Sequence, residues 1–113
     1  MSCEEKALDR YGEDGILTYH RNVWPLEWTI AKRPNDLCYM KMIVEKNSNI
    51  VVGLHYVGPN AGEVMQGFAV AMKLKATKDV FDSTVGIHPT NAEWFCSLSQ
   101  TKQSGQELVN TGC

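Results

Sequence analysis

Six consecutive residues near the end of the chain have the types and spacing of an acid–base pair: His88, Pro89, Thr90, Asn91, Ala92 and Glu93. Pro89 restricts the backbone of His88 to extended geometry and fits the first turn of a following helix. Glu93 then falls in that turn, where its carboxylate can bind one ring nitrogen of His88. Such a bond selects the imidazole tautomer, raises the basicity of the other nitrogen and leaves it facing outward. The spacing therefore predicts that His88 and Glu93 form a catalytic acid–base pair that works on a group from elsewhere.

The same stretch also fits the start of a helix. Thr90 and Glu93 have the spacing of a capping box, in which the hydroxyl and the carboxylate bind free backbone N–H groups. Caps of this kind occur at many helices. The two interpretations are compatible, and both stay open on these residues alone.

The four cysteines, at positions 3, 38, 96 and 113, include no closely spaced pair. Zinc sites and dithiol redox motifs need such short spacings, so no metal site is expected. Cys38 falls in a predicted strand and Cys96 in a predicted helix, where cysteine usually packs as a small apolar side chain. This usage favours a reducing compartment. Cys113 differs, because a thiol at the end of the chain has no core to pack into.

Composition is that of one soluble globular domain of 113 residues, 43% apolar and 21% charged. The net charge is −2 and lysine and arginine form no cluster, which argues against nucleic acid and anionic membranes as partners. No apolar run approaches the roughly 20 residues of a membrane span, and the N-terminus lacks a signal-peptide pattern. We therefore expect a cytoplasmic protein without membrane contact, with a mitochondrial location as the alternative.

Alternation of apolar and polar residues predicts a β-sheet. A short helix precedes it at residues 4–11 and ends at Gly12. Strands are expected at residues 16–20, 26–30, 38–45 and 50–57, with a loop at 32–36. His20 and His55 lie in these strands and are expected to be structural, since a lone strand histidine seldom has a catalytic partner.

Beyond residue 60 the apolar period changes to that of a helix. Apolar residues recur at positions 61, 64, 65, 68, 69 and 72, which is the stripe of an amphipathic helix. Asn60 is the expected N-cap of this helix and Glu63 takes the capping-box position. Gly67 lies inside it at a cost of about 1 kcal/mol relative to alanine, which is tolerable if another backbone approaches closely there. A second, short helix is expected from Thr77.

A third helix is expected at residues 91–103, with Trp94, Phe95 and Leu98 facing inward and Gly105 as its C-terminal stop. The fold class is then α+β: a mostly antiparallel sheet of about four strands with helices packed on one side. Residues 1–105 form this domain. Residues 106–113 show no sustained period and form a flexible tail. The helix stripe at 61–72, with Trp94 and Phe95, exceeds what so small a sheet covers, so the domain is expected to self-associate.

Several separate motifs together resemble a known family. They are Val52-Gly53-Leu54-His55, Gly58-Pro59-Asn60-Ala61-Gly62-Glu63, Gln66-Gly67-Phe68-Ala69 and Thr84-Val85-Gly86-Ile87-His88-Pro89-Thr90. The chain resembles the C-terminal dimerisation (interface) domain of the glutathione reductase and thioredoxin reductase family. Pro25-Leu26-Glu27-Trp28-Thr29 and the terminal Gly112-Cys113 are most similar to animal-type thioredoxin reductases and thioredoxin-glutathione reductases.

The resemblance implies a role inside a larger enzyme. The interface domain forms a homodimer, or pairs with a full-length reductase subunit, and its histidine reaches the partner's active site. His88 would be the acid–base for a thiol there, Glu93 would orient it, and His88 and Pro89 would contact the flavin. FAD and NADPH are implied for the full-length enzyme only, because this segment has no Gly-x-Gly-x-x-Gly turn. The segment alone should be inactive, and the substrate would be a thioredoxin-like or glutathione disulfide.

Two departures from the family pattern stand out. Asn91 occupies a stretch in which animal-type members commonly have cysteine, and it should leave the geometry of His88 and Glu93 intact. The chain stops at Cys113, whereas those enzymes finish in Gly-Cys-selenocysteine-Gly or a cysteine equivalent. Cys113 is therefore expected to be half of a redox pair on a mobile tail, with a UGA codon read as selenocysteine directly after it.

Two other functions compete with this one. The chain could be a stand-alone, non-catalytic dimerisation module, such as a truncated isoform that blunts a full-length subunit. It could also be a small thiol protein that uses Cys113 directly. The upstream coding sequence separates the first two, because only an enzyme part continues in frame into a flavin domain.

Overall fold

A computed structural model describes residues 4–31, 36–108 and 110–112 of the chain. The expected loop at residues 32–36 lies mostly outside this part, as do Cys3 and Cys113.

A four-stranded sheet with the order β3-β2-β1-β4 forms the centre of the fold. The strands are β1 (Ile16–Trp24), β2 (Cys38–Glu45), β3 (Val51–Val57) and β4 (Asn110–Gly112). The pairs β1–β2 and β2–β3 are antiparallel, and β4 runs parallel to the end of β1. The predicted α+β class with a mostly antiparallel sheet is thus confirmed.

Alternation along β2 separates the two faces of the sheet. Cys38, Met40, Met42 and Val44 are buried on one face, and Ile43 is buried on the other. Successive side chains of a strand point to opposite faces, so β2 has an apolar contact on both sides. The central strand is therefore covered from above and below.

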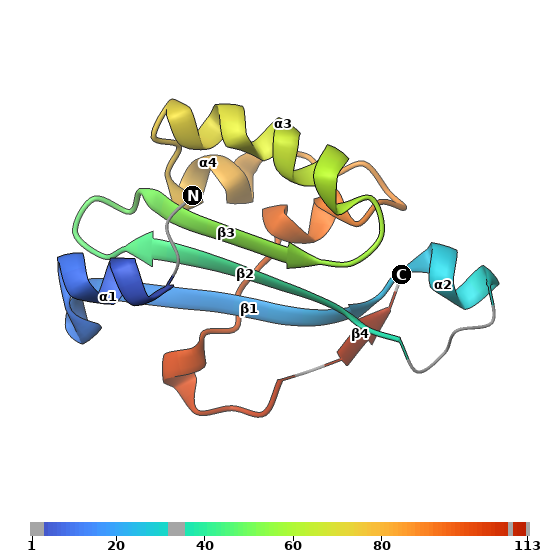
Figure 1. The fold of residues 1–113 in the computed structure, drawn as a ribbon, viewed down its shortest axis with the longest axis horizontal. Coiled ribbons are helices and arrows are strands. Elements are labelled where there is room, and N and C mark those ends of the chain that lie inside the picture. The colour runs from blue at the N-terminus through green and yellow to red at the C-terminus, as the bar shows by residue number, and fades with distance from the viewer. Residues whose placement is uncertain (1–3, 32–35, 109, 113) are drawn as a thin grey trace.

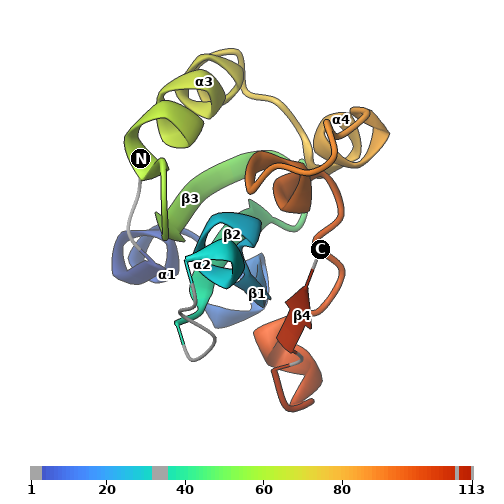
Figure 2. The ribbon, with the colours of Figure 1, turned by 90° about the vertical axis from the view of Figure 1, so that its right-hand side faces the viewer.

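The principal core lies between the sheet and three helices, as Figures 1 and 2 show. These are α3 (Ala61–Lys73), α4 (Lys78–Ser83) and the 3₁₀ helix η2 (Ala92–Cys96). Helix α1 (Glu4–Tyr11), followed by the short η1 (Glu13–Gly15), covers the opposite face, where Ala7 packs on Ile16 and Ile43. Helices therefore pack on both faces of the sheet, whereas the sequence predicted them on one side only. Within the described ranges, no helix is long and apolar enough to cross a membrane.

The predicted strand at residues 26–30 is wrong, because this segment forms the helix α2 (Leu26–Ile30). The N–H groups of Trp28 and Thr29 both donate to the carbonyl of Pro25, at 3.1 and 3.2 Å. The segment follows the end of β1, and no strand of the described residues pairs with it, so its backbone groups bond locally. Its alternating apolar residues do not mark a buried strand face, since Ile30 is 73% exposed.

The predicted helix at residues 91–103 is also wrong. Two 3₁₀ helices form instead, η2 and η3 (Lys102–Ser104), with a non-helical segment between them. The carbonyl of Gln100 in this segment accepts from the N–H of His20 in β1 at 3.0 Å. Pairing with β1 therefore replaces the helical bonds there. Phe95 and Leu98 are buried as expected, and Gly105, with φ +67°, ends η3.

Asn60 begins α3 as expected, but its side chain makes no cap. Its backbone is left-handed, with φ 56°, and its amide donates to Glu27 instead. Thr77 does cap α4, accepting from the N–H of Val80.

The C-terminal segment contains a strand that the sequence did not predict. β4 pairs with residues 22–24 of β1, and the side chain of Asn22 donates to Asn110 at 3.1 Å. Thr111 donates its hydroxyl to the carbonyl of Asn22 at 3.3 Å. The prediction of irregular backbone throughout residues 106–113 is therefore wrong at β4. The flexibility of this segment stays a prediction.

Candidate functional site

His88 and Glu93 are hydrogen-bonded, as their spacing predicts. Nδ1 of His88 lies 3.0 Å from Oε1 of Glu93, and the His88 side chain is 66% exposed. A carboxylate only accepts hydrogen bonds, so Nδ1 must carry the proton that is shared. The neutral ring then has its lone pair on Nε2, which is the atom available to a partner group.

Residues before and after Glu93 in the chain hold it in place. Its N–H donates to the hydroxyl of Thr90 at 3.3 Å, which is one half of the predicted capping box. Two residues later, Phe95 is fully buried and packs against Phe68 with ring centroids 5.1 Å apart. The two predicted contacts therefore coexist: the Thr90 hydroxyl accepts from the N–H of Glu93, and the Glu93 carboxylate binds His88.

The loop that carries His88 returns closely upon Glu93. A Cβ atom on Gly86 would lie 2.7 Å from Cβ of Glu93 and 3.2 Å from its Cα. Only a residue without a side chain fits at that distance. The peptide bond between His88 and Pro89 is cis.

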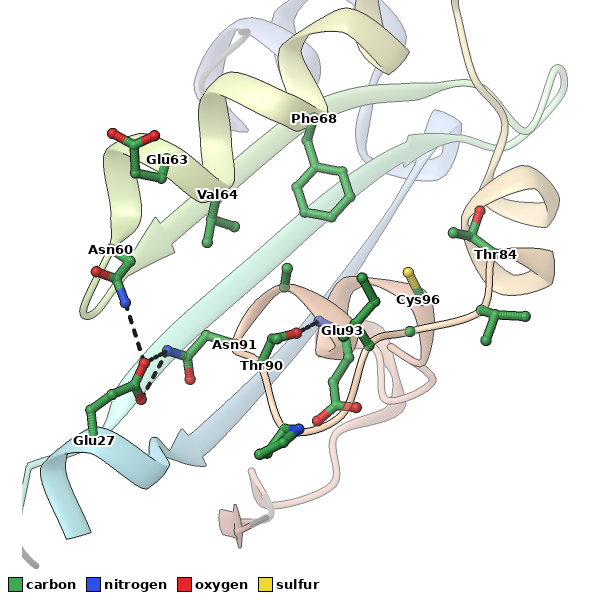
Figure 3. A pocket seen from close by; sticks show the side chains of 15 residues that line it. Glu27, Asn60, Glu63, Val64, Phe68, Thr84, Thr90, Asn91, Glu93 and Cys96 are labelled. Atoms are coloured by element: carbon green, nitrogen blue, oxygen red, sulfur yellow. Dashed lines mark hydrogen bonds between the residues drawn. The ribbon is translucent and has the colours of Figure 1, made fainter. Parts of the chain in front are cut away.

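A second polar contact joins this loop to distant elements. Asn91 is 5% exposed, and its Nδ2 donates to both carboxylate oxygens of Glu27 at 3.2 and 3.3 Å. Asn60, at the start of α3, donates to the same carboxylate at 3.2 Å. Figure 3 shows these three side chains converging from α2, α3 and the His88 loop. Local sequence patterns give no signal for this contact of Glu27, because 64 positions separate it from Asn91.

A hollow of about 480 Å³ lies between these elements. Figure 3 shows Val64 and Phe68 of α3 on one side and Cys96 on another. Pro89 and Glu93 also line it. A smaller hollow of about 250 Å³ lies beside His88 and Trp94. Glu93 thus lines both hollows, whereas His88 lines only the smaller one.

Several large apolar side chains of the helices and of the His88 loop are exposed to solvent. They include Val70 of α3, Leu74 directly after it, Val80 of α4, and Val85 and Ile87 of the loop. These are not the residues for which the sequence predicted an exposed surface, namely the stripe at 61–72 with Trp94 and Phe95. Phe68 and Met72 pack against the core, and Phe95 is fully buried. The exposed apolar surface is instead made by the outer side of the helices and by the loop.

The other candidate side chains have structural surroundings. Burial raises the pKa of the Cys38 and Cys96 thiols, which leaves them protonated and poorly nucleophilic. His20 lies 3.4 Å from the Tyr39 hydroxyl, and burial lowers the pKa of this histidine. In the described part of the chain, no cluster of three or more His, Cys, Asp or Glu could hold a metal ion.

The turn before α3 has no room for a dinucleotide phosphate at its glycine, Gly58. A Cβ on Gly58 would lie 2.5 Å from Sγ of Cys38 and 2.6 Å from the Tyr56 hydroxyl. Gly58 therefore makes room for the protein's own side chains and not for a phosphate. The sheet on which this turn lies is mostly antiparallel, unlike the parallel sheet of dinucleotide-binding folds.

Comparison with known proteins agrees with the family resemblance. A family model described as the pyridine nucleotide-disulphide oxidoreductase dimerisation domain matches residues 2–98. The chain is also 53% identical over 111 residues to a protein named thioredoxin reductase SEP1 from Emiliania huxleyi. That match covers 97% of this chain and 22% of the relative's length.

Proposed function

The chain belongs to the dimerisation-domain family of the pyridine nucleotide-disulphide oxidoreductases, and from that premise we propose that it is the interface domain of an FAD- and NADPH-dependent thioredoxin reductase. In this proposal two subunits pair through this domain, and each presents His88 to the active site of the other. The substrate is a thioredoxin-like or glutathione disulfide. The similarity to a thioredoxin reductase supports this enzyme class.

The observation that carries the proposal is the 3.0 Å bond between Glu93 and an exposed His88 ring. In the proposed reaction a thiol of the partner's flavin domain gives its proton to Nε2 of His88. The resulting thiolate attacks one sulfur of the disulfide, so that a new S–S bond forms and the old one breaks. The departing thiolate then takes the proton from Nε2. Glu93 stabilises the charged ring between these two transfers.

FAD and NADPH belong to the rest of the full-length enzyme in this proposal. Together they supply the two electrons that regenerate the attacking thiol. The packing at Gly58 argues against a phosphate-binding turn directly before α3. We propose accordingly that His88 and Pro89 meet the flavin of the partner subunit only at the dimer interface, and that the segment alone is inactive.

The exposed apolar side chains support dimerisation. Val85 and Ile87, in the loop that carries His88, are 89% and 76% exposed, and Val70 of α3 is 61% exposed. Large exposed apolar surface marks protein interfaces on soluble chains. A two-fold dimer that covers it would also carry each His88 toward the other subunit.

For the C-terminus we propose that Cys113 is one half of a redox pair. The other half would be a second thiol or selenol of the reductase dimer. A single thiol can form only mixed or intermolecular disulfides, whereas a pair can open and close. Thiol alkylation of the full-length enzyme tests this proposal: labelling of Cys113 only after reduction by NADPH supports it, and equal labelling in the oxidised enzyme contradicts it.

His88→Gln in the full-length enzyme tests the central proposal. We expect disulfide turnover to fall roughly 100-fold or more, the usual scale for a lost general acid–base. Flavin reduction by NADPH should persist, because that step does not use the pair. Glu5→Gln, on the exposed side of α1, is a matched charge control that should leave both steps unchanged. Unchanged disulfide turnover in His88→Gln would show that Glu93 and Thr90 serve only the helix cap.

The proposal also requires that the reading frame continues upstream into a flavin domain. An in-frame stop followed by a true start codon would instead favour a stand-alone dimerisation module. That module should bind a full-length subunit and lower its activity in mixing experiments.

A further inference from the structure

The base of the His88 loop is held by a carboxylate from a different part of the fold. Both oxygens of Glu27 accept from the single NH₂ group of Asn91, at 3.2 and 3.3 Å. Resting on the proposed function of His88, we propose that Glu27 and Asn91 are a positioning pair that keeps His88 in register with Glu93. Neither residue touches the reacting atoms in this proposal.

The loop needs such a support because it has no core contact of its own. Phe81 is buried at 3% exposure, and the residues from 82 to 89 are all exposed. Asn91 is the first buried side chain after this stretch. The side chain of His88 therefore projects from a segment whose nearest buried residue on the C-terminal side is Asn91.

The contact is of a kind that can fix a backbone. A buried amide must keep its hydrogen bonds, because leaving one unmade costs its full desolvation. Bonds to a carboxylate are about twice as strong as bonds between neutral groups. Glu27 also accepts from Asn60, so one carboxylate ties the loop to both α2 and the start of α3. Figure 3 shows this junction beside Thr90 and Glu93.

The path from the positioning pair to the acid–base pair is short. Asn91 precedes η2, whose residue Glu93 binds Thr90 through its N–H and His88 through its carboxylate. A shift of Asn91 moves the backbone on both sides of it at once. The loop and η2 would then no longer present His88 and Glu93 to each other at 3.0 Å.

The test uses ring-nitrogen NMR on the full chain in alkaline buffer, where the tautomer of neutral His88 is read directly. In the wild type, Nδ1 should carry the proton. Glu27→Ala should lower the Nδ1–H population and speed exchange of the Glu93 amide roughly tenfold, the scale of one lost charged hydrogen bond. Glu63→Ala, a glutamate of α3 that lines the same hollow, is the matched control and should change neither.

A swapped pair separates positioning from general stability. Asn91→Asp alone would bring two carboxylates together and should disturb the tautomer and the Glu93 amide. Glu27→Gln combined with Asn91→Asp restores the contact with donor and acceptor exchanged. The new amide at position 27 donates to the new carboxylate at position 91, while the amide oxygen still accepts from Asn60. We expect this double variant to return both signals to the wild-type values.

Two outcomes would overturn the inference. One is a Glu27→Ala protein that is folded by circular dichroism and has unchanged His88 ring signals. The other is a double variant that stays as disturbed as Asn91→Asp. The tautomer does not depend on catalysis, so either failure leaves the proposed role of His88 standing. Conversely, normal turnover in His88→Gln would refute that role without touching the positioning contact.

Discussion

Gly86→Ala is the sharpest test of how the loop positions the acid–base pair. The new Cβ would lie 2.7 Å from Cβ of Glu93 and 3.2 Å from its Cα. Carbon atoms rest at about 3.5–4.0 Å from each other, so the loop must move away by roughly 1 Å. The bond between His88 and Glu93, 3.0 Å long, would then stretch to about 4 Å, beyond hydrogen-bond distance.

Gly86→Ala should affect stability only slightly but disulfide turnover strongly. The loop around Gly86 is exposed and can give way, so the free energy of unfolding should fall by less than about 1 kcal/mol, as for surface substitutions. Rigid overpacking would cost about 1–3 kcal/mol instead. Disulfide turnover of the full-length enzyme should fall roughly 100-fold, because misplacement by about 1 Å is enough for that loss.

Thermal unfolding and steady-state turnover together decide the question. Gly62→Ala is the matched control, since no atom lies within 4 Å of the added Cβ. If Gly86→Ala kept full turnover while losing the stability expected of a rigid clash, the loop would not control the position of Glu93 and the reasoning would be refuted.

Two further substitutions test other parts of the structure. Gly67→Ala should stabilise the chain by roughly 0.5–1 kcal/mol in thermal unfolding, because glycine weakens a helix interior and no atom lies within 4 Å of the added Cβ. Weaker self-association of this variant in sedimentation would place Gly67 in the dimer contact, and a loss of stability would contradict the prediction. Glu4 accepts from Lys41 at 2.8 Å and from Lys102 at 2.9 Å. Burial alone would raise the pKa of Glu4, but the hydrogen bonds and charges of the two lysines outweigh it and hold this pKa at about 2. Because that value lies below the ordinary 4.5, the stability from Glu4 is present above pH 4.5 and is lost as the pH falls toward 2. Glu4→Gln should lower the free energy of unfolding by roughly 1–2 kcal/mol at neutral pH and flatten its acid dependence in urea titrations. An unchanged acid dependence would show that the lysine contacts contribute nothing.

Local patterns in the sequence predicted the features that depend on near neighbours. The alternation at Cys38, Met40 and Met42 predicted β2, and the apolar stripe after Asn60 predicted α3. The pairing of His88 with Glu93 followed from a separation of five residues, which a turn closes by itself. In each case the interacting groups lie within a few residues, so the covalent geometry of the chain limits their arrangement.

Features decided by distant contacts could not be predicted in this way. Trp94, Phe95 and Leu98 have helical spacing, yet the chain leaves the helix after Cys96 and pairs with β1. There His20 donates to the carbonyl of Gln100, and Tyr19 forms a bridge with Thr101. The segment at 26–30 alternates like a strand, but no strand of the described residues pairs with it, and it forms α2. Glu27 and Asn91 meet across 64 positions only because the sheet and α3 bring their elements together. Residue order thus determined that His88 and Glu93 contact each other. Tertiary packing decided that Glu27 meets Asn91 beside them, because the local chain cannot bring such distant residues together.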